Sequence, residues 1–235
     1  MDVQKRRGRK AEASAEQIKA IARAQMAAGG AAALSLRAIA REMGMTAPAL
    51  YRYFPRLDDL ITALILDAFN AHADAMAQAA DQYPDDDYAG RLWGALLAYR
   101  QWALDHPVDF QLIYGSPIPG YSAPAELTVP AASRAFVVVV SALDGALRAG
   151  LLHPLPEYSA MPAPVQARLE LINQRDGYVV PPVILAIATR GWTHIHGVVM
   201  LESFGHLAPV VGDVDAFYRF ELVSLYRSLG MTPPE

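Results

Sequence analysis

Two short helical patterns on either side of one glycine constrain the fold of this chain more than any other feature of its sequence. They cover Leu36–Met43 and Thr46–Phe54, and Gly44 between them can take the left-handed backbone conformation of a tight turn. The Ser35 hydroxyl can cap the first helix, and Pro48 fits the first turn of the second, where its missing N–H does no harm. Apolar side chains at regular spacing can seal the two helices against each other: Ile39, Met43, Met45, Leu50 and Tyr53.

This spacing predicts a helix-turn-helix at about residues 36–54, with an ordinary helical hairpin as the less specific alternative. The second helix of such a motif enters the major groove of DNA, where small side chains let the backbone approach the base edges. Tyrosine hydroxyls and guanidinium groups there donate hydrogen bonds to phosphates or bases, although Tyr53 fits a core position equally well. The candidate DNA contacts are Thr46, Ala47, Pro48, Tyr51, Arg52 and Tyr53, with Arg37 on a flanking phosphate.

The charge of the chain is divided between two regions. Residues 1–56 hold 11 Lys and Arg against 4 Asp and Glu, a net charge of +7, whereas the remainder holds 9 against 20, a net charge of −11. A basic head on an acidic body is typical of a protein that meets a polyanion at one end only. Residues 1–13 are polar and basic, and we expect a flexible arm that either enters a minor groove or adds nonspecific attraction.

Helical periodicity continues through the rest of the chain. Ser14 and Gln17 form a capping box that predicts a helix from Ser14 to Gly29. Further helices are predicted at about residues 58–82, 88–105, 108–113, 126–149, 164–173, 183–207 and 213–229. The sequence has no convincing alternating strand pattern, so the predicted fold class is all-α. The predicted domains are the arm at 1–13, a three-helix DNA-binding domain with the helix-turn-helix at 14–57, and a larger helical domain at 58–235.

Composition excludes several classes of protein. The chain has 235 residues, of which 53% are apolar, enough for a sizeable core. It contains no Cys, which excludes disulfide scaffolds and thiolate metal sites and fits a reducing cytosol. No apolar region of a signal peptide follows the charged N-terminal segment, and the apolar stretch Phe136–Val140 is far shorter than the roughly 18–20 residues of a membrane helix. We therefore expect a cytoplasmic protein without a membrane contact.

The stretch Ser35–Pro55, SLRAIAREMGMTAPALYRYFP, followed by DDL at residues 58–60, resembles the N-terminal domain of the TetR family of transcriptional regulators. The resemblance covers about residues 14–62. Trp192–Gly197, WTHIHG, is similar to the Trp and His-Gly signature of one TetR C-terminal subgroup. Where the family usually has a small capping residue and then a phosphate-contacting Lys, this chain has Arg56 and Leu57. Leu57 cannot make that contact, and Arg56 is the expected substitute.

The resemblance implies a homodimeric repressor whose recognition helices reach successive major grooves of a pseudo-palindromic operator, about 34–36 Å apart. It also implies a pocket in the larger domain for a small apolar or aromatic effector, and the aromatic content there is compatible with one. Aromatic residues at helical spacing are equally typical of a core. The candidate effector contacts are Trp93, Leu97, Trp102, Tyr114, Phe136, Trp192, His196 and Met200.

The last two predicted helices are the candidates for the dimer interface. Both carry apolar stripes with few charges between them, as the packing of four helices across a two-fold axis requires. Burial within the same subunit is an alternative explanation of the stripes. They consist of Ile184, Ile187, Ala188, Gly191, Ile195 and Val199, and of Phe217, Phe220 and Leu225.

Two other functions remain as alternatives to a ligand-responsive, DNA-binding transcriptional regulator. A metal-dependent hydrolase using His194, His196 and His206 requires residues 190–197 to be a strand, because residues two apart on a helix are separated by about 200°. On a helix, His196 shares a face with Trp192, and we expect its ring to stack there with a nitrogen bonded to a carbonyl or hydroxyl. The other alternative is a helical small-molecule carrier. No catalytic residue, metal ligand or cofactor is predicted.

Overall fold

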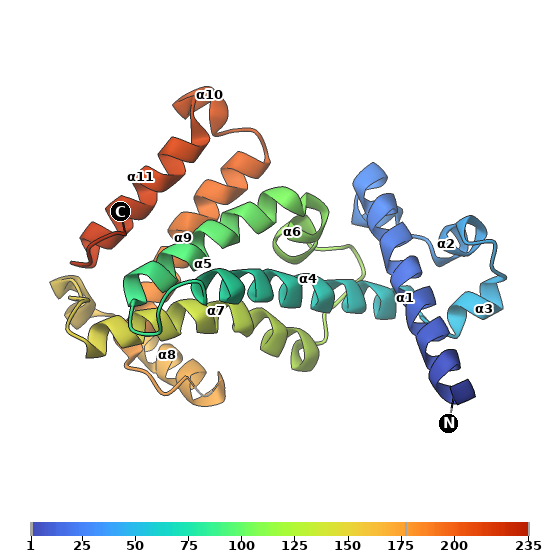
Figure 1. Ribbon diagram of the computed structural model, residues 1–235, viewed down its shortest axis with the longest axis horizontal. Coiled ribbons are helices and arrows are strands. Elements are labelled where there is room, and N and C mark those ends of the chain that lie inside the picture. The colour runs from blue at the N-terminus through green and yellow to red at the C-terminus, as the bar shows by residue number, and fades with distance from the viewer. Residues whose placement is uncertain (1, 177, 235) are drawn as a thin grey trace. The chain divides into compact units, whose positions relative to one another are not determined.

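The computed structural model describes residues 2–176 and 178–234, and for residues 2–13, 159 and 176 it describes the backbone alone. Every regular element in these residues is helical, which confirms the predicted all-α class. The chain forms two compact units (Figure 1). Unit 1 consists of Met1–Ala68 and His106–Thr128, and unit 2 consists of Phe69–Asp105 and Val129–Glu235.

Most helix bounds lie within a few residues of the predicted ones. Two short 3-10 helices, at Ala31–Ala33 and Pro156–Ala160, accompany the α-helices. The α-helices are α1 (Asp2–Gly29), α2 (Leu36–Glu42), α3 (Ala47–Tyr51), α4 (Leu57–Ala80), α5 (Tyr88–Asp105), α6 (Pro107–Tyr114), α7 (Ala125–Arg148), α8 (Ala163–Asp176), α9 (Pro182–Ser203), α10 (Ala208–Val211) and α11 (Val214–Ser228).

The start of α1 differs from the prediction. The helix begins at Asp2, so the predicted capping box at Ser14 lies inside a helix and does not start one. The preceding residues are mostly Lys, Arg, Glu, Gln and Ala, which are strong helix formers, and Gly8 alone does not interrupt them. The predicted arm falls on this part of α1. Its side chains lie outside the described residues, so its flexibility and its DNA contact stay predictions.

Unit 1 holds α1, α2, α3, the first half of α4, and α6. Ile18, Ile39, Leu50 and Phe110 are fully buried in its core. Two ion-pair contacts add to this packing: Lys19 Nζ lies 2.6 Å from Asp67 Oδ2 on α4, and Arg23 Nε donates to both carboxylate oxygens of Asp109 on α6 at 2.9 Å.

These contacts explain why the division of the chain differs from the predicted boundary after residue 57. The first half of α4 and the segment His106–Thr128 belong with the N-terminal helices. Lys19 and Arg23, which the charge count assigned to the basic head, are engaged inside this unit. The difference depends on pairings between residues far apart in the sequence, which local patterns do not reveal.

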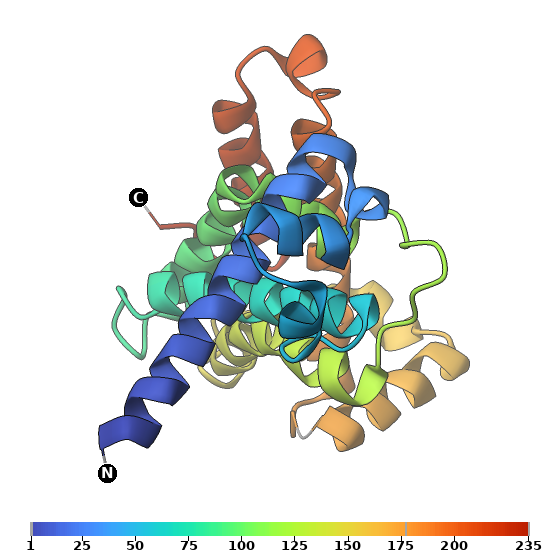
Figure 2. The ribbon, with the colours of Figure 1, turned by 90° about the vertical axis from the view of Figure 1, so that its right-hand side faces the viewer.

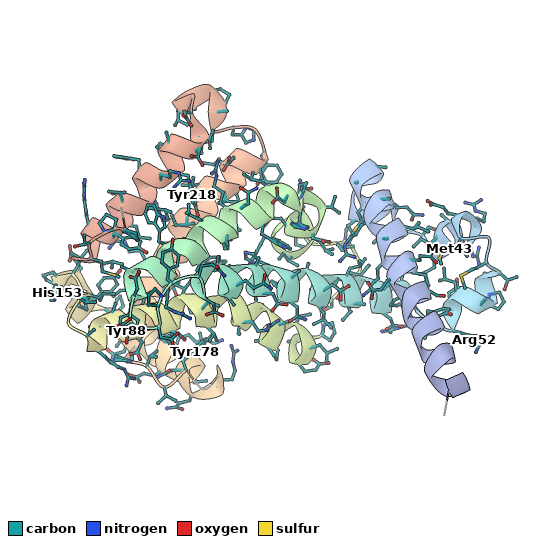
Figure 3. All side chains as sticks on the ribbon, in the orientation of Figure 1. Met43, Arg52, Tyr88, His153, Tyr178 and Tyr218 are labelled. Carbon is teal, nitrogen blue, oxygen red and sulfur yellow. The ribbon has the colours of Figure 1, made fainter. Side chains whose placement is uncertain are left out.

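Unit 2 is organised around α5, whose buried side chains include Leu92, Leu96, Tyr99 and Trp102. Two buried tyrosines of α11 bind its backbone: Tyr218 Oη donates to Leu96 O at 2.6 Å, and Tyr226 Oη donates to Ala89 O at 2.7 Å. Figure 3 shows the Tyr218 side chain between the two helices. Figure 2 shows α9 and α11 as neighbouring antiparallel helices joined through α10. These contacts hold α5 and α11 together in one core.

α7 is long and apolar enough to cross a membrane, by length and composition, and no other helix in the part of the chain that the structure describes meets this test. Its most apolar 18-residue window has a mean hydropathy of 1.5 and is 33% buried. The apolar stretch Phe136–Val140 thus belongs to a longer apolar helix than the sequence pattern indicated. Core helices of soluble proteins pass the same test, and Arg134 in α7 is paired with Asp74. The expected absence of a membrane contact stays a prediction.

Candidate functional site

The α2–α3 pair has the local geometry of a helix-turn-helix. Ser35 Oγ accepts a hydrogen bond from the Ala38 N–H at 3.4 Å, which confirms the predicted cap of α2. Gly44 has a φ of 63°, the left-handed conformation that the tight turn requires. The Met45 N–H then donates to Ala40 O at 2.9 Å, and the chain continues into α3. The predicted motif is thus present in the structure (Figure 1).

α3 is shorter than predicted, because it ends at Tyr51 and not at Phe54. The Tyr53 N–H donates to Leu50 O at 2.8 Å. This hydrogen bond spans three residues, as in a 3-10 turn, and not four as in an α-helix. Pro55 disfavours the helical conformation for the residue before it, which explains the early end. Thr46 precedes α3, and its side chain makes no capping hydrogen bond.

None of the eight predicted DNA contacts is buried. Tyr51 is 39% exposed, and Arg52, at the end of α3, is also exposed (Figure 3). Ala47 and Tyr53 are half-buried, which leaves Tyr53 open to both of its predicted roles. The others, Arg37, Thr46, Pro48 and Arg56, are exposed. The predicted residues therefore lie on or directly beside the short α2–α3 pair, with their side chains accessible.

The basic side chains of this region fall into two groups. Among the residues that the structure describes, Arg37, Arg41 and Arg52 make no ion pair. Arg56 differs, because its guanidinium group lies 3.2 Å from Asp59 Oδ1. Unpaired, exposed guanidinium groups keep their full attraction for phosphate oxygens. The helix-turn-helix thus presents three such groups.

An aromatic and imidazole cluster occupies unit 2. The ring of His72 on α4 lies 4.7 Å from the Tyr99 ring and 4.8 Å from the Trp102 ring, both on α5. Tyr99 Oη lies 2.6 Å from His196 Nδ1 on α9, and the His196 ring lies 5.5 Å from that of Trp192. The predicted environment of His196, beside Trp192 and bonded to a hydroxyl, is thereby confirmed. We call these five residues the His72 cluster.

Both imidazoles of the His72 cluster are held in the neutral form. Burial lowers the pKa of His72 to about 4, and the nearby His196 adds to this effect. Burial also lowers the pKa of His196. A neutral imidazole offers one donor and one acceptor, so the cluster combines apolar ring faces with polar atoms that carry no charge at neutral pH.

The eight predicted effector contacts do not gather in one place. Trp102, Trp192 and His196 belong to the His72 cluster. Trp93 packs instead against Tyr226, with ring centroids 5.6 Å apart, and Phe136 packs against Tyr178 at 6.1 Å. Leu97 and Met200 are half-buried in unit 2, whereas Tyr114 lies in unit 1, 5.2 Å from the Phe110 ring.

Sequence reasoning missed two members of the cluster as site residues. His72 stands in an otherwise apolar stretch of α4, a signal that could have drawn attention to it. Tyr99 stands among several other large apolar and aromatic residues of α5, so its sequence context alone gives no sign of a site. Nothing local connects these residues with His196, which lies 97 positions after Tyr99 in the chain.

A largely buried ion pair ties three helices of unit 2 together. Arg100 on α5 donates from Nε and Nη2 to the two carboxylate oxygens of Glu202 on α9, both at 2.7 Å. It also donates to Asp215 of α11 at 2.8 Å, and its guanidinium carbon lies 5.1 Å from the centre of the Tyr218 ring. The hydrogen bonds to Glu202 raise the pKa of Arg100, which stays charged.

The predicted dimer stripe of α9 turns out to be mainly part of the core of its own subunit. Ile184, Ile187, Ala188, Ile195 and Val199 are all buried, so burial within the same subunit, the alternative explanation, holds for these five residues. Buried and interface stripes have the same helical spacing, which is why the sequence could not separate them. Other apolar side chains on α9 and α11 remain exposed in the single chain: Trp192, Leu201, Phe204 and Phe220.

The hydrolase alternative fails on local geometry. Residues 190–197 are helical, so His194 and His196 face different sides of α9. His194 Nε2 lies 2.6 Å from Glu221 Oε2, whereas His196 contacts Tyr99. Within the described residues, no three His, Asp or Glu side chains are placed to hold a metal ion.

Known proteins resemble this chain along most of its length. Residues 18–64 match the family described as bacterial regulatory proteins, tetR family, and residues 92–225 match the tetracyclin repressor-like C-terminal domain. HTH-type transcriptional regulator Rv1816 of Mycobacterium tuberculosis and Mb1846 of Mycobacterium bovis are each 34% identical over 194 residues, covering 81% of this chain and 82% of the relative.

Solved structures agree with these matches. The crystal structure of the regulatory protein SCO4313 superposes on this chain with a TM-score of 0.76 and 37% sequence identity, and the match covers 93% of this chain and 97% of SCO4313. A bacterial regulatory protein in the tetR family from Rhodococcus RHA1, at 19% identity and a TM-score of 0.64, shares the fold and covers 93% of this chain and 97% of its own. With its helix-turn-helix, its exposed cations and these relatives, the chain belongs to the TetR family of DNA-binding transcriptional regulators.

Proposed function

We propose that this regulator is a homodimeric repressor that a small apolar or aromatic effector releases from a pseudo-palindromic operator. The observation that carries the proposal is the helix-turn-helix with three exposed guanidinium groups, on Arg37, Arg41 and Arg52, that make no ion pair within the part of the chain that the structure describes. Such groups attract the phosphate backbone, while α3 enters the major groove. In a dimer, two such heads contact successive grooves of one face of the duplex, about 34–36 Å apart.

Each predicted contact has a role in this proposal. Arg37 and Arg52 donate to phosphates or guanine edges, and the hydroxyls of Thr46 and Tyr51 donate to phosphates. Ala47 and Pro48 permit close approach of α3 to the bases. Tyr53 contributes from a half-buried position. Arg56 contributes less than Arg52, because it is already bound to Asp59.

A second copy of this chain is the proposed occupant of the exposed face of α9 and α11. Trp192 is 42% exposed, Phe204 49% and Phe220 62%, although large aromatic side chains gain most from burial. A Cβ added at Gly197 would meet nothing within 4 Å in this subunit, so a neighbouring helix can approach closely there. A two-fold axis beside α9 and α11 would bury these residues in a four-helix interface.

The His72 cluster is the proposed effector contact. Aromatic ring faces favour a flat apolar molecule, and the Tyr99–His196 hydrogen bond offers a polar group to orient it. An effector that binds one arrangement of unit 2 more tightly shifts the population away from the DNA-binding form, with a coupling of roughly 1–3 kcal/mol.

Repression is tested with a reporter gene placed behind the DNA that flanks the protein's own gene. We expect wild-type protein to lower reporter expression and the double variant Tyr51→Ala/Arg52→Ala to leave it unchanged. Higher expression with the wild-type protein would show activation and contradict the repressor role. Small aromatic compounds that raise the melting temperature of the purified protein are then added, and a true effector restores expression.

The dimer is tested by light scattering after size-exclusion chromatography. Wild-type protein should have twice the 25.5 kDa mass of one chain, about 51 kDa. We expect Phe220→Glu combined with Trp192→Glu to give monomers. Leu171→Glu is the matched control, since Leu171 is 55% exposed on α8 and belongs to neither α9 nor α11, and it should leave the mass unchanged. A dimer that survives the first pair of changes rules this face out.

A further inference from the structure

The recognition helix carries very few groups that can read bases by hydrogen bonding. Residues 46–53 read TAPALYRY, without Asn, Gln, Asp, Glu or Lys. In the major groove, Asn and Gln pair with adenine, and Asp and Glu accept from cytosine. α3 can make neither of these contacts. The hydrogen-bonding side chains of residues 46–53 are the Arg52 guanidinium and the hydroxyls of Thr46, Tyr51 and the half-buried Tyr53.

The accessible side chains of α3 include the small apolar residues Ala47, Pro48 and Ala49. Ala47 and Tyr51 are four residues apart, as are Pro48 and Arg52, so these four side chains share one face of the helix. Leu50, between them in the sequence, is fully buried against the rest of unit 1. Pro48 is exposed and Ala47 half-buried, so the Ala47 methyl group and the Pro48 ring lie at the surface beside Tyr51 and Arg52.

Only one base edge in the major groove offers a complementary apolar group, the C5 methyl of thymine. We propose that Ala47 and Pro48 read thymine methyl groups, so that each operator half-site carries thymine where this pair faces the groove. The inference depends on the proposed placement of α3 in the major groove. It goes beyond that placement, because it names the base that this chain selects and the atoms that select it.

The size of the effect follows from burial of a methyl group. Removing one methyl from a closed apolar contact costs about 0.8 kcal/mol, which is about a fourfold loss of affinity. Two such contacts in each half-site would give losses that multiply. A phosphate contact by Arg52 is insensitive to this change, since it does not involve the base.

The experiment starts from random duplex DNA, from which the full-length protein selects its preferred sites. Each thymine of the selected site is then replaced, one at a time, with deoxyuridine, which lacks only the C5 methyl group. We expect one or two positions in each half-site to lose about fourfold in affinity and thymines outside the half-sites to lose nothing. Selected half-sites that bind equally well with deoxyuridine at every position would overturn the proposal.

A variant assigns the effect to the residue. Pro48→Ala keeps a good helix former, so α3 should persist, and its melting temperature checks this. In this variant the difference between thymine and deoxyuridine at one position should shrink, whereas Arg52→Ala should weaken both DNAs equally. An unchanged difference in Pro48→Ala and in Ala47→Gly would overturn the assignment. Failure to enrich any sequence would instead contradict sequence-specific DNA reading as a whole.

Discussion

The two units of this regulator use their charged side chains in opposite ways. In unit 1, the helix-turn-helix exposes Arg37 and Arg52 without an ion pair within the described residues. In unit 2, Arg100 is almost buried and donates to both oxygens of Glu202. An unpaired surface cation attracts a polyanion and adds little to folding, whereas the two charges of a largely buried pair depend on each other, so that removal of one destabilises the fold, and have no attraction left for a partner.

This difference separates the consequences of mutation. Changes on the α2–α3 surface should alter DNA binding and leave stability nearly untouched. Changes at Arg100 or in the His72 cluster should alter stability first. A change in one unit that moved the quantity expected of the other unit would break the comparison.

The largest effect is expected for Arg100→Met, which leaves Glu202 buried without its partner. The free energy of unfolding, measured by urea denaturation, should fall by about 3–5 kcal/mol. Adding Glu202→Leu should recover much of this loss, because no uncompensated charge then remains. Arg219→Met is the control, since its pair with Asp215 is exposed, and it should cost less than about 1 kcal/mol. Equal losses for Arg100→Met and Arg219→Met would refute the contrast.

The next effect concerns pH and His72. The folded-state pKa of this histidine is lowered to about 4 by burial, below its ordinary value of 6.5. Stability from neutral His72 is therefore present above pH 6.5 and is lost as the pH falls through 4, by about 3 kcal/mol in all. His72→Leu should remove this part of the pH dependence, whereas His194→Gln, at a half-exposed site, should not. Parallel stability curves for wild type and His72→Leu would speak against a buried neutral imidazole.

A smaller effect is expected from Arg52→Ala in unit 1. Loss of one contact to DNA should weaken operator binding by about 1–2 kcal/mol. If Arg52 binds a phosphate, the slope of log affinity against log salt should also fall by about 1, whereas a base contact would leave the slope nearly unchanged. The melting temperature should not change. Arg168→Ala is the matched control, an exposed arginine of unit 2 without an ion pair among the described residues.

The smallest effect is expected at the ion pair between Arg56 and Asp59. Arg56→Ala should weaken DNA binding less than Arg52→Ala does, because the guanidinium group is already bound. In Asp59→Asn, the side-chain amide oxygen can still accept the hydrogen bond from the Arg56 backbone N–H at the start of α4. The negative charge that competes with DNA for the Arg56 guanidinium is removed. Affinity for DNA should then rise by about two- to threefold. No gain in this variant would show that Arg56 does not substitute for the Lys of the family.

The same contrast explains what the sequence could predict. The helix-turn-helix is made by one contiguous stretch, so the Ser35 cap, the turn at Gly44 and the exposed face of α3 all follow from local spacing. The bounds of α5 are also as predicted, Tyr88–Asp105. Recognition of DNA could therefore be read from local residues alone.

The His72 cluster is assembled from three distant helices, and local spacing does not reveal it. His72 comes from α4, Tyr99 from α5 and His196 from α9. The apolar stripe of α9 has the spacing of an interface and of a core alike, and burial decides for the core. The place of residues 106–128 in unit 1 depends in the same way on the long-range pair between Arg23 and Asp109.

Selective binding of DNA through α2 and α3 is tested most directly by fluorescence anisotropy. Full-length protein is titrated into labelled duplexes from the DNA flanking its own gene and from an unrelated sequence, at several salt concentrations. We predict tighter, salt-dependent binding to the first duplex by wild type and Arg168→Ala. For Tyr51→Ala/Arg52→Ala we predict a loss of at least about tenfold with unchanged melting. Equal affinity of wild type for both duplexes, or undiminished affinity of the double variant, would contradict the account.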